Sequence, residues 1–229
     1  MKKLGLVGGM GPESTISYYH GIVYGVQRRM GRPIFPALTI ESVDVFRVLE
    51  LCGQNAYTEL TDYLLAAIGR LAAAGAEVAA LCANTPHIVF DALQKRSPIP
   101  LVSVIDATCE ETLRCGYDRV GLLGTTFTMN GDFFKKPFEE KAIAIVAPAL
   151  REQAYISRKI AGELELGVVK DETRRAFFKI VRRMRDEEHI QAVILGCTEL
   201  PLLFSGMDAA VPVLDTLQIH LAKLIDGIV

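Results

Sequence analysis

The sequence contains the same pair of apolar segments twice, in the same order and at nearly the same spacing. The segment LGLVG at 4–8 resembles VGLLG at 120–124, an offset of 116 residues. The segment AALCANT at 79–85 resembles VILGCTE at 193–199, an offset of 114 residues. Apolar segments that end in small residues can look alike by chance, but two similar offsets in one order indicate a duplicated unit.

Short apolar runs, typical of buried strands, alternate with segments of helical periodicity. The predicted strands lie at 4–8, 37–42, 78–82, 101–105, 120–124, 143–146, 192–196 and 211–214. Helices are predicted at 56–74 and at 171–188, the second capped by Asp171. This alternation predicts an α/β fold with parallel sheets, whose ligands bind beyond the carboxyl ends of the strands. With the repeat, it predicts two similar parallel-sheet lobes related by pseudo-twofold symmetry, with the active site in the cleft between them.

Composition and charge exclude several classes of protein. Glu77 interrupts the richest apolar stretch, at 71–82, so the chain lacks the run of about 18 apolar residues of a membrane span. The net charge is −2 and the basic residues are scattered, which argues against nucleic-acid binding. Five cysteines, an odd number without a CxxC pair, favour a reducing, cytoplasmic compartment. The chain has no motif for a metal, nucleotide or pyridoxal phosphate, so we expect no cofactor.

The strand predicted at 192–196 ends in a polar cluster. Cys197 is followed by Thr198 and Glu199, so a thiol at the strand's carboxyl end lies beside a hydroxyl and a carboxylate. This is a suitable place for a thiolate base or nucleophile, although a buried apolar cysteine is the more common case. Thr125 and Thr126, after the strand at 120–124, add hydroxyl donors on the same side.

Two segments of the first half are candidates for binding a ligand. GGMGPES at 8–14 follows the first strand and opens a helix, so the backbone at Met10 and Gly11 can approach a small carboxylate, although a tight turn explains the glycines equally well. After the strand at 78–82, Asn84 and Thr85 can hydrogen-bond a substrate. His87 could act as an acid or base, but a lone histidine at a helix start is more often a packed residue.

These residues resemble the aspartate/glutamate racemase family of cofactor-independent amino-acid racemases. The resemblance rests on GGMGPEST at 8–15, NT at 84–85, GT at 124–125 and GCTE at 196–199, and so extends over nearly the whole chain. It implies two α/β lobes, a homodimer, and one catalytic cysteine at a strand end of each lobe. Because the C-terminal segment of the family returns to the first lobe, it implies lobes of 1–103 plus 213–229 and of 104–212.

The resemblance also implies an activity. It predicts racemisation of aspartate or glutamate without pyridoxal phosphate, by a base on one face of the α-carbon and an acid on the other. The small acidic amino acid would be bound by backbone N–H groups, hydroxyls and a cation. Arg47 and Lys170 are candidates for the cation, although a plain surface role is as well supported for each.

The chain departs from the family pattern at the first cysteine. The family places it directly before Asn-Thr, where this chain has Ala83, and the offset of 114 also pairs Cys197 with Ala83. Because neighbouring strand residues face opposite ways, Cys82 should point away from the substrate unless the strand end is bulged. Two further functions therefore stay open: a single-cysteine lyase or isomerase of a small dicarboxylate, and a weakly active protein that binds an acidic metabolite.

Overall fold

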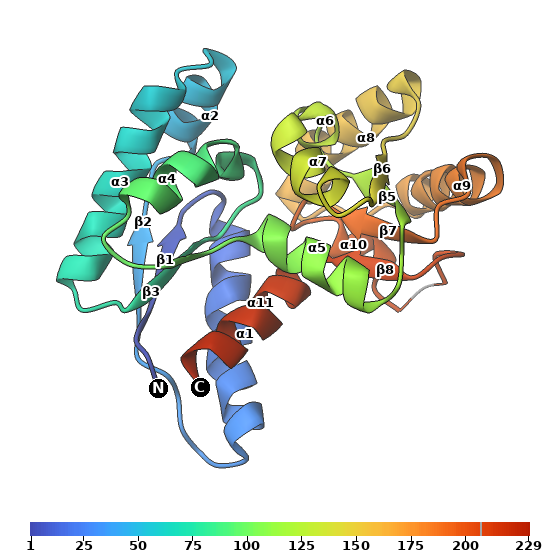
Figure 1. Cartoon of the computed structure of the whole chain (residues 1–229). Helices are drawn as coiled ribbons and strands as arrows, with labels where there is room; N and C mark the ends of the chain where they lie inside the picture. The colour runs from blue at the N-terminus through green and yellow to red at the C-terminus, as the bar shows by residue number, and fades with distance from the viewer. Residues whose placement is uncertain (207) are drawn as a thin grey trace. The chain divides into compact units, whose positions relative to one another are not determined.

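The structure is a computed structural model that describes residues 1–206 and 208–229. It divides into two compact units, unit 1 of Met1–Ala107 with Leu217–Val229 and unit 2 of Thr108–Thr216. Each unit has a four-stranded sheet, parallel at every pairing, with helices around it (Figure 1). The predicted α/β class with two similar parallel-sheet lobes is confirmed.

Unit 1 has the strand order β2-β1-β3-β4. Its strands are β1 (Leu4–Gly8), β2 (Leu38–Ser42), β3 (Val78–Leu81) and β4 (Leu101–Val102). Its helices are α1 (Pro12–Met30), α2 (Val45–Gly53), α3 (Tyr57–Ala73), the 3₁₀ helix η1 (Thr85–Val89), α4 (Phe90–Arg96), the first residues of α5 (Val104–Arg114) and nearly all of α11 (Thr216–Ile228).

Alternation along the strands gives the unit 1 sheet two different faces. Leu4 and Leu6 join an apolar cluster with α1 and α11. Between them Gly5 faces the other way, where an added Cβ would lie 3.1 Å from Leu71 at the end of α3. The sheet therefore lies between α3 and the pair formed by α1 and α11, as Figure 1 shows.

Unit 2 has the strand order β6-β5-β7-β8. Its strands are β5 (Arg119–Leu123), β6 (Ala144–Val146), β7 (Ala192–Leu195) and β8 (Val213–Asp215). Its helices are the rest of α5, α6 (Thr126–Asn130), α7 (Asp132–Glu139), α8 (Leu150–Gly162), the 3₁₀ helix η2 (Leu164–Leu166), α9 (Asp171–Glu188) and α10 (Pro201–Phe204). On one face of its sheet, an added Cβ at Gly121 would lie 3.1 Å from Met184 of α9, so this helix packs closely there.

The two repeated segments occupy the same places in the two sheets. In unit 1, Leu4 pairs with Val78 and the register runs on to Val7 opposite Leu81. In unit 2, the residues at offsets of 116 and 114 form the same register, from Val120↔Ala192 to Leu123↔Leu195. The units therefore share strand order and central register, so Ala83 and Cys197 each lie two residues beyond the end of equivalent strands.

Some predicted elements need correction. The strand predicted at 101–105 is only Leu101–Val102, because α5 begins at Val104. The strand predicted at 211–214 begins later, at Val213. Asp171 is not the cap of α9: Lys170 occupies the cap position without a side-chain hydrogen bond, and Asp171 is the first helical residue. The positive end of the helix dipole stabilises a carboxylate in the first turn, which explains why the helix begins with an acidic residue that is not its cap.

Candidate active site at the end of β7

Cys197 lies just beyond β7, a central strand of the unit 2 sheet. The connecting residue Gly196 donates its N–H to Leu123 O at 2.7 Å, which extends the pairing with β5 by one residue. An added Cβ at Gly196 would lie 3.0 Å from the same oxygen, so glycine lets the two strand ends approach closely. This packing fixes the point at which the thiol leaves the sheet.

One carboxylate oxygen binds both polar side chains beside it. The Cys197 thiol donates to Glu199 Oε2 at 2.9 Å, and Thr198 Oγ1 donates to the same oxygen at 3.0 Å. The turn that carries them is closed by Leu200 N–H, which donates to Cys197 O at 3.2 Å. The structure therefore brings together the three adjacent residues predicted from the GCTE segment.

The surroundings of Cys197 favour the neutral thiol. Burial, followed by the negative charge of Glu199, raises the pKa of Cys197 well above its ordinary value, and Glu165 adds to the rise. Burial and then Glu199 raise the pKa of Glu165 in turn. The thiol thus carries its proton at neutral pH, and Glu199 is the acceptor in contact with it.

The two predicted threonines follow the neighbouring strand β5. Thr125 caps α6, because its Oγ1 accepts the N–H of Thr128 at 3.3 Å. Thr126 donates its backbone N–H to Ser157 Oγ at 3.3 Å, and its residue is exposed. Since β5 and β7 are adjacent and parallel, these threonines and Cys197 leave the same edge of the unit 2 sheet.

Lys170 is anchored to an acidic side chain in the loop before α9. Its Nζ lies 3.1 Å from Glu163 Oε1, which Lys159 also contacts, while Thr173 Oγ1 donates to the other oxygen at 2.6 Å. The contact with Lys159, then that with Thr173, lowers the pKa of Glu163 to about 2. The Lys170 side chain remains half exposed, so its ammonium is open to solvent as well as paired.

The equivalent strand end in unit 1 has a different character. Cys82 is fully buried in the cluster shared with α1 and α11, and burial strongly raises the pKa of its thiol. Ala83 is half-buried, Asn84 is buried and Thr85 begins η1. Of the predicted site residues in this segment, Cys82 is therefore the one whose side chain packs in the apolar core.

The glycine-rich turn after β1 lies beside this strand end. Met10 is buried and Gly11 precedes α1 without a side-chain cap. An added Cβ at Gly9 would meet Val43 O at 2.3 Å, so the backbones after β1 and β2 approach as only glycine allows. Ser14, in the first turn of α1, donates to Cys82 O at 2.6 Å and so links the turn to the end of β3.

Arg47 lies on α2 in unit 1. Its side chain is nearly half exposed and pairs with Glu50 one helical turn later at 2.6 Å. The structure thus places Arg47 and Lys170 in different units, each with an acidic partner. Among the residues at these sites, Glu165 belongs to no motif that singles it out, because it acts on Cys197 only as a tertiary neighbour.

The other cysteines lie away from these strand ends. Cys52 is buried on α2, while Cys109 is buried on α5 and donates to Pro137 O at 3.4 Å. Cys115 is partly exposed and contacts Glu111. Among the residues that the structure describes, no three His, Cys, Asp or Glu side chains lie close enough together to bind a metal ion. Over the same residues, no helix has the length and apolar character that a membrane span requires.

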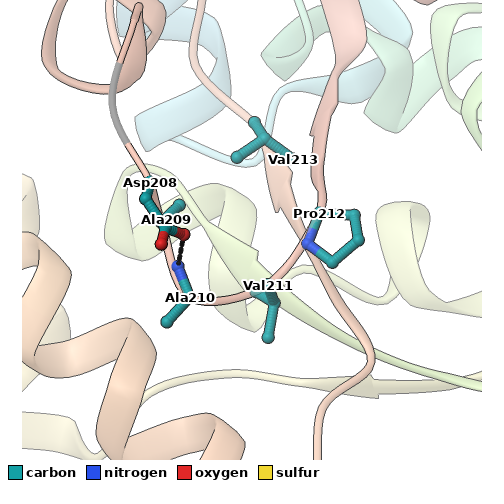
Figure 2. Close-up of a pocket in the computed structure, with 6 residues that line it drawn as sticks. All are labelled: Asp208, Ala209, Ala210, Val211, Pro212 and Val213. Atoms are coloured by element: carbon teal, nitrogen blue, oxygen red, sulfur yellow. Dashed lines mark hydrogen bonds between the residues drawn. The ribbon is translucent and has the colours of Figure 1, made fainter.

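A surface pocket of unit 2 lies elsewhere on its sheet. It measures about 430 Å³ and is lined by residues 208–213, which lead into β8. Ala210 N–H donates to Asp208 Oδ1 at 2.9 Å in this segment, the bond drawn as a dashed line in Figure 2. Because these residues precede β8, the pocket is at the amino end of that strand, opposite to the sheet edge that carries Cys197. It contains no predicted site residue.

Comparison with known proteins decides the family. A family model described as Asp/Glu/Hydantoin racemase matches residues 7–224. The chain belongs to this family. An aspartate racemase homologue from Pyrococcus horikoshii OT3 is 39% identical, with a TM-score of 0.88 and 99% of both chains covered. A Yersinia pestis protein assigned to the Asp/Glu racemases is 35% identical, with a TM-score of 0.92 and the same coverage.

Curated relatives are more distant. The glutamate racemase of Hydrogenobaculum sp. strain Y04AAS1 is 26% identical over 65% of this chain, and the match spans 53% of that enzyme, about half its length. The predicted resemblance to the aspartate/glutamate racemases is nevertheless confirmed by the family match.

Proposed function

We propose that this protein is a cofactor-independent amino-acid racemase that acts on aspartate or glutamate, with Cys197 as its acid–base thiol. The observation that carries the proposal is the 2.9 Å contact between the Cys197 thiol and Glu199 at the carboxyl end of β7. A thiol at such an edge, with a carboxylate as proton acceptor, is suited to proton transfer at a carbon acid.

The proposed step moves one proton at a time. Cys197 passes its S–H proton to Glu199, and the thiolate removes the α-proton of the amino acid to leave a carbanion. Return of the proton from Cys197 regenerates the same enantiomer, whereas protonation from the other face gives its mirror image. Because Cys82 lies in the apolar core of unit 1, a water molecule is the proposed donor on that other face. The hydroxide that this water leaves takes the proton from Glu199, so that Cys197 is again a thiol and Glu199 a carboxylate.

Substrate binding is proposed for the polar groups predicted from the sequence. Backbone groups at Met10 and Gly11 and side chains at both strand ends would bind the two carboxylates and the ammonium of an acidic amino acid. The side chains are those of Asn84, Thr85, Thr125, Thr126, Thr198 and Glu199. Lys170 and Arg47 are the proposed cations, and each would shift from its present acidic partner when it binds a carboxylate.

A second function is favoured by one observation. The site position equivalent to Cys197 holds Ala83, and the nearby Cys82 is buried. A reaction that needs one proton donor, such as decarboxylation or isomerisation of a small dicarboxylate, would be served by Cys197 alone. This lyase or isomerase is the alternative to a racemase.

We propose a homodimer in a reducing, cytoplasmic compartment. The five cysteines are all free thiols, which fits reducing conditions. An exposed apolar stripe along α1, with Ile16 at 59% and Tyr19 at 50% exposure and Tyr24 beside Phe35, supports self-association. Light scattering after size-exclusion chromatography tests it: a dimer mass that becomes monomeric in Tyr19→Lys is expected, and a wild-type monomer contradicts it.

The proposed activity is tested by a chiral assay. Both enantiomers of aspartate and of glutamate are incubated with the wild type, with Cys197→Ala, and with Cys109→Ala as a control that removes another thiol of unit 2. Interconversion by the wild type and the control, and none by Cys197→Ala, is expected. Loss of carbon dioxide or isomerisation of an alkene diacid would support the lyase or isomerase, and ligand stabilisation without turnover would indicate a binding protein.

A further inference from the structure

The end of β3 has backbone carbonyls that the sheet cannot bind. Strand β1 pairs with β3 only as far as Val7↔Leu81, and β4 only as far as Ala80↔Val102. The carbonyls of Cys82 and Ala83 therefore extend beyond the ladder, in a place where an unpaired buried carbonyl is costly. Side chains replace the missing strand: Ser14 donates to Cys82 O at 2.6 Å, and His87 Nδ1 lies 2.9 Å from Ala83 O.

The hydrogen-bond network assigns the tautomer of His87. Val104 N–H donates to Nε2 at 3.3 Å, so that nitrogen carries the lone pair and Nδ1 carries the hydrogen that Ala83 O accepts. His87 is 3% exposed, and its ring stacks on Phe90 with centroids 5.0 Å apart. Burial lowers the pKa of His87 to about 4. Both ring nitrogens are thus occupied, and the ring is neutral at neutral pH.

The Ala83 carbonyl sets the direction of the chain beyond it. Because the peptide is planar, fixing this carbonyl fixes the plane shared with Asn84 and hence the start of η1 at Thr85. In unit 2 the equivalent carbonyl, Cys197 O, is bound by the backbone instead, because it accepts the N–H of Leu200. In unit 1 the side chain of His87 takes that place.

We infer that His87 is a positioning residue, whose Nδ1–H bond to Ala83 O holds the peptide after Ala83 in the orientation that presents Asn84 and Thr85 to the substrate. The inference rests on the proposed racemase function and deepens it, since it gives His87 a role without proton transfer. A misplaced substrate contact costs about 10²-fold in rate even where no reacting group is lost.

Two conservative substitutions separate the two bonds of the ring. In His87→Asn the amide nitrogen lies near the place of Nδ1 and can still donate to Ala83 O, while the acceptor for Val104 N–H is lost. In His87→Gln the longer side chain reaches the place of Nε2 and its oxygen can accept from Val104 N–H, while the donor to Ala83 is lost. Each variant loses one buried hydrogen bond, so their midpoints of urea unfolding should fall by similar amounts.

The expected result is a split between activity and stability. With the favoured substrate, kcat of His87→Asn should stay within about threefold of the wild type and that of His87→Gln should fall about 10–10²-fold, with the same pH profile in all three. Equal losses of kcat that follow stability would overturn the inference in favour of a purely structural ring. A shifted pH profile in both variants would overturn it in favour of an acid–base role.

Two controls keep the outcome readable. Cys197→Ala, assayed in parallel, must be inactive; if it is active, the proposed function fails whatever the His87 variants do. If a variant does not fold, ¹⁵N NMR of the histidine-labelled wild type decides instead. A protonated Nδ1 and unprotonated Nε2 at His87 from pH 5.5 to 8 are expected, and titration of this ring near pH 6.5 would contradict the inference.

Discussion

The strand ends after β3 and β7 occupy equivalent places in two sheets of one topology, yet their chemistry differs. Beyond β7, Cys197 presents a thiol in contact with Glu199. Beyond β3, the equivalent residue is Ala83, and the polar side chains nearby serve the backbone: Ser14 binds Cys82 O and His87 binds Ala83 O. A shared register thus determines where a side chain leaves the sheet, while the residue at that position decides whether the end can transfer a proton.

A shift of one residue is enough to change the role of a cysteine. Cys82 is next to the equivalent position, but strand alternation directs its side chain into the apolar cluster with Leu6 and Tyr18. Cys197, in contrast, is half-buried at the sheet edge. Thiols near a predicted site therefore cannot be counted as acid–base groups until their side of the strand is known.

The largest expected effect comes from removing the thiol of Cys197, in contrast to removing that of Cys82. Cys197→Ala should lower turnover by about 10²–10⁴-fold, because it removes the proposed proton-transfer group. Cys82→Ala should leave turnover within about twofold and lower the free energy of unfolding by roughly 1–2 kcal/mol, because it leaves a small void in the core. Chiral chromatography and urea unfolding measure the two quantities. Loss of turnover in a folded Cys82→Ala protein would contradict the purely structural role given to Cys82.

The second effect concerns the carboxylate beside Cys197. Glu199→Gln should lower the pKa of the thiol, because the negative charge that raises it is removed, while turnover falls about tenfold for lack of a proton acceptor. The pH dependence of Cys197 alkylation by iodoacetamide, followed by mass spectrometry, measures the first. Glu165→Gln is the matched control, with a smaller shift in the same direction because Glu165 contributes less. An upward shift in Glu199→Gln would contradict the electrostatic argument.

Much of the architecture could be predicted from the sequence, because it depends on local periodicity. The strand at 4–8 and the helix at 171–188 have the predicted bounds, and the two offsets identified the pairs of equivalent strands, β1 with β5 and β3 with β7. The short β4 could not be predicted, because the apolar run at 101–105 suits either a strand or the start of a buried helix.

The candidate site was only partly accessible from the sequence. The GCTE segment identified Cys197, Thr198 and Glu199 because they are adjacent in the chain. Glu165 lies 32 residues before Cys197 and acts on it only through the fold, so no spacing could reveal it. The packing of Cys82 could be predicted, because strand alternation is a local rule. The bond from His87 to Ala83 could not, because it depends on how the chain turns after the strand.

A third expected effect is on stability in acid, and it again separates the units. Unit 1 buries two neutral histidines, His87 and His220, the latter bound to Tyr18 and to Val102 O. Burial lowers their pKa values to about 4 and about 3, below the value of about 6.5 in the unfolded chain. The unfolded chain therefore binds these protons first, and the stability present above pH 6.5 is lost as the pH falls, by about 1.4 kcal/mol per pH unit for each histidine.

This loss should be confined to the unit that contains the histidines. Hydrogen exchange at pH 7.5 and pH 5 is expected to show unit 1 amides losing protection, after correction for the intrinsic rate, more than those of unit 2. His220→Gln, which keeps a donor for Val102 O, should have a weaker pH dependence of urea unfolding than the wild type. Equal acid sensitivity of both units, or an unchanged slope in His220→Gln, would contradict this account of the buried histidines.

The central claim is that one strand end supplies a thiol and its equivalent does not, and exchange in deuterated water tests it most directly. NMR follows loss of the α-proton signal of each enantiomer of aspartate and glutamate, and chiral chromatography follows inversion. For one enantiomer, exchange with retention should be faster than inversion; Cys197→Ala should abolish both, and Ala83→Cys should raise inversion. Exchange that survives in Cys197→Ala, or unchanged inversion in a folded Ala83→Cys protein, would contradict the claim.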